Sequence, residues 1–237
     1  MAREKVFRFK QFSVRNDKSA MKVGTDGVLL GAWADVTSAK RVLDIGTGTG
    51  LIALMIAQRC NAKITAVEID NDAACEASQN FLESPWAERL SVEKADFEIY
   101  ANECTEKYDV IVSNPPYFVN SLECPDDKRT KARHTDSLSY NTLIEGASKL
   151  LTESGSIFLI TPSDVEEIID KCVKAYGMYV VEKVYVCPVV NGLPKRILWK
   201  ISKNNSVLKE SDFAIEIDRH KYTQEYISLT REYYLNM

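Results

Sequence analysis

A polar tetrapeptide at positions 114–117, Asn-Pro-Pro-Tyr, directly follows the apolar run Tyr108–Ser113, which is typical of a buried strand. Proline gives a sheet no N–H donor and fixes its own backbone angle, so the tetrapeptide predicts a rigid turn at the end of that strand. The Asn114 side-chain oxygen and the Pro115 carbonyl then suit the two N–H groups of a planar amine, and Tyr117 suits stacking on its ring. The alternative is an ordinary strand-ending turn, because Asn-Pro and Pro-Pro dipeptides commonly mark turns.

A glycine-rich turn, Gly46-x-Gly48-x-Gly50, follows the predicted strand Arg41–Ile45, and Asp44 lies two residues before the first glycine. Glycines let the backbone turn tightly and approach a ligand closely, which Rossmann oxidoreductases also exploit. S-Adenosylmethionine has no phosphate but carries an ammonium and a sulfonium group. A carboxylate at the strand end therefore favours that ligand over a dinucleotide, which needs a helix N-terminus for its pyrophosphate.

Two further acids follow predicted strands. Glu68 ends the strand Lys63–Glu68, where an acidic side chain can accept from the two hydroxyls of a ribose, in nicotinamide enzymes as well. Asp96 follows the strand Leu90–Lys94 and can accept from an adenine amino group while Phe97 packs on the ring. The alternative for either acid is a solvated loop position.

The elements that position these residues alternate between strand and helix, which predicts an α/β fold with a mainly parallel sheet and helices on both faces. An Asn-Gly pair in the segment 188–194 predicts a final hairpin that puts an antiparallel strand at the sheet's edge. In such sheets ligands bind beyond the carboxyl ends of the strands, so Asp44, Glu68, Asp96 and Asn114 are expected at one edge. The predicted strands are 6–12, 41–45, 63–68, 90–94, 108–113, 157–161, 179–187 and 196–201, and the predicted helices are 26–33, 51–59, 71–82, 138–151 and 165–176.

Bulk properties restrict the class of protein. A chain of 237 residues is long enough for one well-packed core, and its net charge of −4 gives no global sign of nucleic-acid binding. Local basic clusters do occur, at residues 1–22 and 128–134, and phosphate contacts need only such patches; the alternative is a solvated loop. Cysteines and histidines lack zinc-ligand spacing, so no metal is expected, and without a signal peptide or membrane span we expect a cytoplasmic protein with free thiols.

The motifs occur in the order of the class I S-adenosylmethionine-dependent amino-methyltransferases, whose fold is Rossmann-like with a seven-stranded sheet. The N-terminal block is more specific, because Phe9–Phe12 and Ala20–Trp33 resemble the bacterial tRNA1(Val) (adenine(37)-N6)-methyltransferase family. Residues 132–138 and the tail from Tyr222 also resemble that family, so the resemblance covers nearly the whole chain.

The resemblance implies methyl transfer from S-adenosylmethionine to the N6 amine of adenine in tRNA, expected at adenine 37 in the anticodon loop, with no obligate protein partner. It implies one methyltransferase domain, residues 1–237, in which an N-terminal extension (1–40) covers the cofactor site of a catalytic core (41–237). Asp44 and the three glycines would hold the methionine moiety, Glu68 the ribose, and Asp96 with Phe97 the adenine. Three residues of the extension would close the cofactor site: Thr25, Asp26 and Gly27. Six cations would contact RNA phosphates: Lys10, Lys22, Arg129, Lys131, Arg133 and Arg196.

In this mechanism the substrate amine is itself the nucleophile, so positioning supplies most of the acceleration, up to roughly 7–11 kcal/mol. Asn114 and Pro115 accept the amino protons, Pro116 stiffens the turn, and Tyr117 stacks on the extruded base. The same tetrapeptide also serves N-methylation of protein glutamine and of guanine N2 in ribosomal RNA, and these alternatives stay open. Two other classes stay open as well: a nicotinamide oxidoreductase, which would leave the tetrapeptide unexplained, and a non-enzymatic RNA-binding module.

Overall fold

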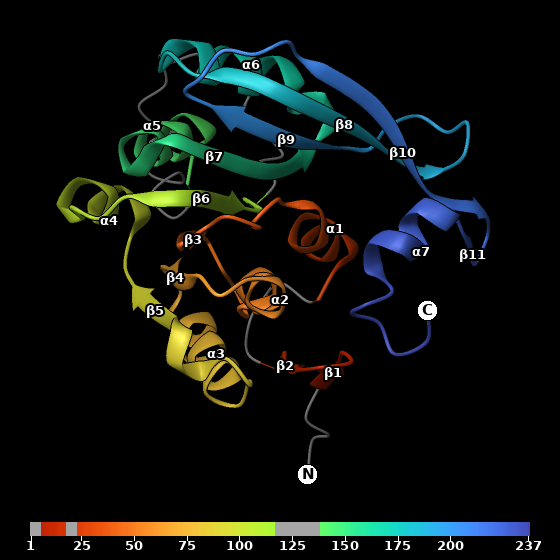
Figure 1. The fold of residues 1–237 in the computed structure, drawn as a ribbon, viewed down its shortest axis with the longest axis horizontal. Coiled ribbons are helices and arrows are strands. Elements are labelled where there is room, and N and C mark those ends of the chain that lie inside the picture. The colour runs from red at the N-terminus through yellow and green to blue at the C-terminus, as the bar shows by residue number, and fades with distance from the viewer. Residues whose placement is uncertain (1–5, 18–22, 117–137) are drawn as a thin grey trace, which may run out of the picture.

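The computed structural model describes residues 6–17, 23–116 and 138–237 as a mixed sheet covered by helices, with a small N-terminal hairpin at its side (Figure 1). Within this part of the chain the main sheet has nine strands in the order β11-β10-β8-β9-β7-β6-β3-β4-β5. Its strands are β3 (Arg41–Ile45), β4 (Lys63–Glu68), β5 (Leu90–Lys94), β6 (Tyr108–Ser113), β7 (Leu151–Pro162), β8 (Tyr179–Val189), β9 (Arg196–Ser202), β10 (Lys209–Asp218) and β11 (Lys221–Tyr222). The separate hairpin pairs β1 (Val6–Arg8) with β2 (Ser13–Arg15).

Helices cover both faces of the sheet. One face carries α1 (Thr25–Trp33), α2 (Leu51–Arg59), α3 (Asn71–Leu82) and α7 (Gln224–Thr230), and the other carries α4 (Phe97–Glu103), α5 (Tyr140–Leu150) and α6 (Glu166–Ala175) (Figure 1). Two short 3-10 turns, η1 (Ala87–Arg89) and η2 (Ser163–Val165), precede β5 and α6.

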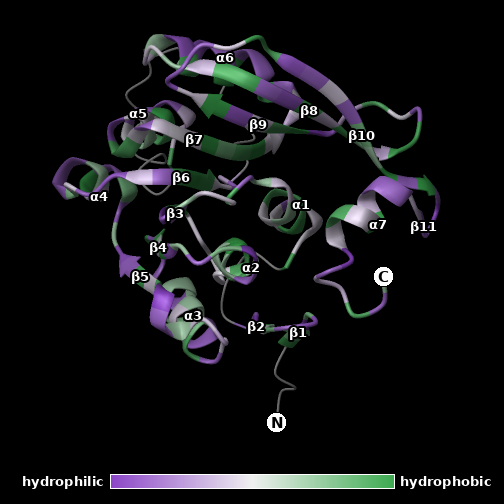
Figure 2. Cartoon of the chain, viewed as in Figure 1, coloured by the Kyte–Doolittle hydropathy of each residue, from purple (hydrophilic) through white to green (hydrophobic). Residues whose placement is uncertain are grey.

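Successive side chains of a strand face opposite sides of the sheet, so each face of the sheet carries its own hydrophobic core. Val42 and Val112 face the core shared with α1 and α2, whereas Leu43 and Ile111 face the core shared with α4 and α5. All four side chains are buried, which is why the central strands read as continuous apolar runs rather than as an alternating pattern. In Figure 2 hydrophobic colour is clearest on β7, β9 and α2, and hydrophilic colour covers much of β10.

The expected α/β architecture is confirmed, and the sheet differs from the expectation at one side. The antiparallel strand β9 lies inside the sheet, because it pairs with β7 on one side and with β8 on the other. Beyond β8 the sheet continues with β10, which pairs with β8 in parallel. Asn191 adopts a left-handed backbone (φ 61°) between β8 and β9, as the Asn-Gly turn predicts. The expected N-terminal strand over residues 6–12 is a two-stranded hairpin, and β10, β11, α4 and α7 were not predicted.

Local signals explain the element boundaries. The Asp70 side chain accepts from the Ala73 N–H at 2.8 Å and starts α3, and the Ser139 hydroxyl accepts from the Thr142 N–H at 3.1 Å at the start of α5. Gly50 has a left-handed backbone (φ 83°) at the start of α2, and a side chain there would collide with the Phe81 ring.

In the described part of the chain, no helix has the length and apolar character that crossing a bilayer demands.

Candidate functional site

The four polar strand ends lie at one edge of the sheet, as expected. Adjacent strands pair in parallel, with Ile45 of β3 opposite both Val67 of β4 and Ser113 of β6, and Glu68 opposite Lys94 of β5. The residues that follow these positions therefore emerge side by side, although they are far apart in the sequence.

The glycine-rich turn leaves β3 in a conformation that other residues avoid. The backbone φ angles of Gly46, Gly48 and Gly50 are 68°, 57° and 83°. The Gly46 N–H donates to the Val67 carbonyl at 2.9 Å, which binds the turn to β4. A Cβ built on Gly46 or Gly48 would have no atom within 4 Å, so the turn borders open space on the side where a ligand would lie.

Asp44 supports this turn from beneath. Its side chain is completely buried, and Oδ2 accepts from the Thr47 hydroxyl at 2.6 Å and from the Ala53 N–H at 3.2 Å. Within the described residues, Oδ1 accepts no hydrogen bond. Desolvation raises the pKa of this carboxyl to about 7, against the lowering effect of the two hydrogen bonds. Asp44 thus joins β3, the turn and α2, and it does not line the cavity directly.

Glu68 ends β4, and Asp96 follows the next strand of the sheet, β5, by two residues. The Glu68 carboxylate accepts from the Gly48 N–H at 2.8 Å and from the Asp70 N–H at 2.9 Å, so its position beside the turn is fixed. Asp96 is half-buried, and its Oδ1 accepts from the N–H groups of Glu98 and Ile99, which makes it the N-cap of α4. Asp96 therefore has a structural task beside the one predicted for it.

The structure places Phe97 away from the position that the sequence predicted. Its side chain is only 5% exposed and packs against α5, where a Cβ on Gly146 would come within 2.6 Å of the ring. Because Phe97 is the first residue of α4, the cap at Asp96 turns its ring into the core. A stacking role for Phe97 on a ligand ring does not fit this packing.

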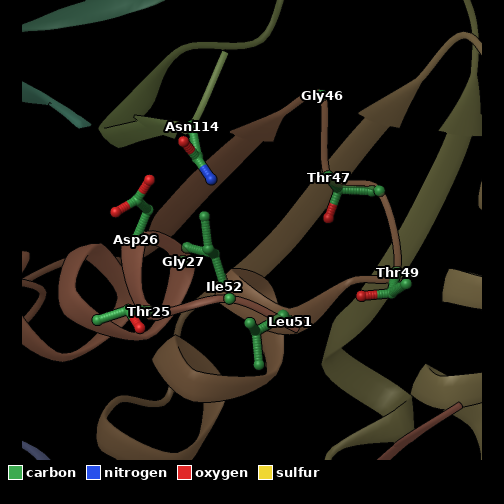
Figure 3. A pocket seen from close by; sticks show the side chains of 11 residues that line it. Thr25, Asp26, Gly27, Gly46, Thr47, Thr49, Leu51, Ile52 and Asn114 are labelled. Atoms are coloured by element: carbon green, nitrogen blue, oxygen red, sulfur yellow. The ribbon is translucent and has the colours of Figure 1, made fainter. Parts of the chain in front are cut away.

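A cavity of about 320 Å³ lies between the glycine-rich turn, the start of α1 and the end of β6 (Figure 3). This volume is in the range of small-molecule sites. Asn114, which is half-buried, and Asp26 point toward the same space from different elements (Figure 3). The lining residues are Gly24, Thr25, Asp26, Gly27, Gly46, Thr47, Gly48, Thr49, Leu51, Ile52 and Asn114.

The cavity combines two of the predicted groups, the N-terminal triplet Thr25–Gly27 and the glycine-rich turn, with Asn114. The sequence analysis did not predict four lining residues that lie between or after the glycines: Thr47, Thr49, Leu51 and Ile52. Their position within the glycine-rich motif could have indicated them. Pro115 is buried and Pro116 is exposed, consistent with a turn fixed on one side by the core. The predicted residues Tyr117, Lys22, Arg129, Lys131 and Arg133 lie outside the described residues.

Arg196 also has a different environment from the one predicted. Its Nε donates to Asp26 Oδ2 at 2.8 Å, and both side chains are partly exposed, at 30% and 23%. Arg196 therefore braces the cavity wall formed by α1, where an exposed phosphate contact was predicted. Lys10 lies in the N-terminal hairpin, and its ammonium donates to the Arg231 carbonyl.

The site fits a small cationic nucleoside derivative. An open glycine cradle lies beside a fixed carboxylate, Glu68, and above a buried carboxylate, Asp44, which has one unpaired oxygen. Carboxylates attract ammonium and sulfonium groups and accept from ribose hydroxyls, which are the groups that S-adenosylmethionine carries. No group of residues suited to a metal occurs in the part of the chain that the structure describes.

Comparison with known proteins gives concordant results. Residues 19–186 match the family model described as "Methyltransferase small domain". Proteins named tRNA1(Val) (adenine(37)-N6)-methyltransferase from Bacteroides fragilis and Bacteroides thetaiotaomicron are 49% and 50% identical, each covering 98% of this chain and 98% of the relative. A crystal structure of a predicted O-methyltransferase from Agrobacterium tumefaciens superposes with a TM-score of 0.70 at 20% identity, covering 88% of this chain and 96% of that one.

Proposed function

The chain belongs to the bacterial tRNA1(Val) (adenine(37)-N6)-methyltransferase family, and we propose that it transfers a methyl group from S-adenosylmethionine to N6 of adenine 37 in the anticodon loop of tRNA1(Val). The observation that supports this function best is the single cavity lined by both the glycine-rich turn and Asn114. A donor held by the turn and an amine held by Asn114 would meet in that cavity. Because tRNA is the substrate, the proposal places the enzyme in the cytoplasm.

The cofactor would lie along the glycine-rich turn. Gly46 and Gly48 would contact its methionine part, Glu68 would accept from the ribose hydroxyls, and Asp96 would accept from the adenine amino group. Asp44 and Gly50 would keep the turn in shape, since Asp44 binds Thr47 and Gly50 has no room for a side chain. When bound, the cofactor supplies an electrophilic methyl group on a sulfonium. The extension, residues 1–40, would cover it with Thr25, Asp26 and Gly27.

Asn114 and Pro115 would orient the substrate amine. The Asn114 side-chain oxygen and the Pro115 carbonyl accept its two N–H groups, and these bonds favour the positive charge that grows on nitrogen during attack. Asn114 follows a strand that is held on both sides, by β3 and by β7, so its position is rigid. Pro116 stiffens the turn, and Tyr117 stacks on the base, which leaves its own stack at a cost of a few kcal/mol.

A nucleoside assay tests this proposal. The purified protein is incubated with methyl-labelled S-adenosylmethionine and either total tRNA or a tRNA1(Val) transcript, and the RNA is digested to nucleosides. We expect N6-methyladenosine, and no label in a matched transcript whose adenine 37 is replaced by guanine. Label in N2-methylguanosine or in protein glutamine would contradict the proposal, as would calorimetry that detects binding of NAD and not of S-adenosylmethionine.

A further inference from the structure

Two segments extend the functional edge of the sheet beyond the cavity. The loop 188–195 joins β8 to β9, and residues 216–222 contain the end of β10, a turn and β11. Because β10 and β8 are parallel to each other and β9 is antiparallel to both β7 and β8, both segments lie at the carboxyl edge of the sheet, the edge that carries Asn114. Together they are called the edge platform.

Backbone hydrogen bonds make the edge platform one continuous surface. The Val190 N–H donates to the Glu216 carbonyl at 2.9 Å, which joins the loop to the end of β10. The Ser163 N–H donates to the Lys195 carbonyl at 3.2 Å, so the loop is also fixed to the end of β7. Arg196 then connects the platform to the cavity wall through its ion pair with Asp26.

The edge platform presents apolar and cationic side chains together. Leu193 and Ile217 are 78% and 60% exposed, and Val189, Val190 and Tyr222 are each about 40% exposed. Lys195, Arg219, His220 and Lys221 are exposed, and within the described residues neither the two lysines nor Arg219 forms an ion pair. Figure 2 shows hydrophobic and hydrophilic residues in both segments.

Two acids belong to the same surface. Asp218 Oδ1 accepts from the Arg219 N–H at 2.7 Å, which shapes the turn, and Glu216 is half-buried. His220 has a left-handed backbone (φ 62°), so the three consecutive residues Arg219, His220 and Lys221 occupy a tight turn at the tip of the platform. The chain as a whole carries a charge of −4, whereas this tip carries two cations and an imidazole.

The sheet spacing gives the platform's reach. Neighbouring strands lie about 4.8 Å apart, so β9 is about 10 Å and β10 about 19 Å from β6, the strand that carries Asn114. One strand of a nucleic acid duplex places a phosphate about every 3.4 Å along its axis. The platform therefore reaches roughly three to six nucleotides from a base held at Asn114 at the stacked rise, and fewer where the bases are unstacked.

Resting on the proposed function, we propose that the edge platform binds the tRNA on one side of the target adenine, with Arg219 and Lys221 on backbone phosphates and the exposed apolar side chains against unstacked bases. Exposed cations beside apolar and aromatic surface are what single-stranded RNA requires for phosphate contact and base stacking. Continuity with the cavity favours RNA over a partner protein, because a nucleic acid held at Asn114 has to leave the site across an adjoining surface.

The test compares two double variants with equal loss of charge. Arg219→Ala with Lys221→Ala removes two cations from the platform, and Lys174→Ala with Lys209→Ala removes two exposed cations near the opposite edge, at the end of α6 and the start of β10. Affinity for tRNA is measured by anisotropy across a range of salt, and methyl transfer by kcat and KM. Melting temperature and S-adenosylmethionine affinity verify that each variant is folded.

For the platform variant we expect KM and Kd for tRNA to rise about tenfold, with kcat nearly unchanged, and the salt dependence of log Kd to weaken by about 1.4–1.8 for two lost phosphate contacts. The matched pair should behave like the wild type. An equal KM for tRNA and an equal salt dependence of log Kd in the two variants would contradict the proposal that the edge platform binds tRNA. A wild type that binds tRNA through the platform but methylates no tRNA would instead overturn the proposed function, so the two failures are distinguishable.

Discussion

Gly48→Ala tests whether the glycine-rich turn contacts the cofactor, as distinct from what the turn contributes to the stability of the fold. Gly48 has a φ of 57°, and a Cβ there would have no neighbour within 4 Å. An alanine in this backbone region costs about 1–2 kcal/mol. Each kcal/mol shifts the melting temperature of a domain of this size by roughly 2–4 °C. The Gly48 N–H, which donates to Glu68, stays in place.

Gly177 provides a matched control for the same backbone strain. Its φ is 65°, a Cβ there would also lie in open space, and it lies between α6 and β8, at the opposite edge of the sheet. Gly177→Ala should therefore lower the melting temperature by a similar amount without touching the cavity.

The two variants are compared by thermal unfolding without ligand and by calorimetric titration with S-adenosylmethionine. We expect similar losses of melting temperature, and an S-adenosylmethionine Kd that rises about tenfold or more for Gly48→Ala alone. That factor is 1.4 kcal/mol, within the 1–3 kcal/mol that an extra methyl group costs at a tightly packed surface. Equal donor affinity in the two variants would refute the assignment of this turn to the cofactor.

Three further substitutions test other parts of the site. Asn114→Ala should lower kcat by about 100-fold or more, as the loss of one transition-state hydrogen bond does, with donor affinity nearly intact; a collapse of calorimetric donor affinity would contradict this division of roles. Asp44→Asn should remove a pH dependence of stability. The folded pKa of Asp44, about 7, lies above its unfolded value, so between about pH 4 and 7 the native state holds a proton that the unfolded state has lost. The free energy of unfolding therefore falls as pH rises through that window, by on the order of 4 kcal/mol. Urea unfolding at pH 5 and pH 8 should detect about 3 kcal/mol of this difference, because part of the window lies below pH 5. An equal decline in the variant would show that Asp44 is not its source. Phe97→Ala should cost about 3–5 kcal/mol of stability and change donor affinity in the folded protein less than twofold; the reverse result would restore the predicted ring contact.

The central elements could be predicted because their signals are local. The helix 71–82 and the strands 63–68 and 108–113 have the boundaries that the sequence indicates. Asp70 caps the helix, and the two strands are apolar runs that end at polar residues, so neighbours in the sequence supply the information.

The added strands could not be predicted in the same way. The sequence of β10 alternates acids with small or apolar residues and is largely exposed, and its pairing partner β8 is more than twenty residues earlier in the chain. Such a strand forms because an open sheet edge is available to it, which a local pattern does not report.

Residue type alone also left the tasks of several site residues undetermined. Asp44, Asp96 and Arg196 were predicted as ligand contacts, and each has a protein partner: the Thr47 hydroxyl, the α4 backbone and the Asp26 carboxylate. A motif fixes where an acid lies relative to its strand. Burial and the neighbouring elements decide which of its oxygens remain available to a ligand.

The two halves of the site are positioned by one pair of strands. The Ser113 hydroxyl donates to the Ile45 carbonyl at 2.8 Å, so the residue before Asn114 is bonded to the residue before the glycine-rich turn. Adjacent strands lie about 4.8 Å apart, and Ile45 and Ser113 are both completely buried. The distance between a donor on the turn and an amine at Asn114 is thus set by the hydrogen-bonded spacing of β3 and β6. Reaction by positioning needs that constancy, because a displacement of about 1 Å between reacting groups can cost 100-fold in rate.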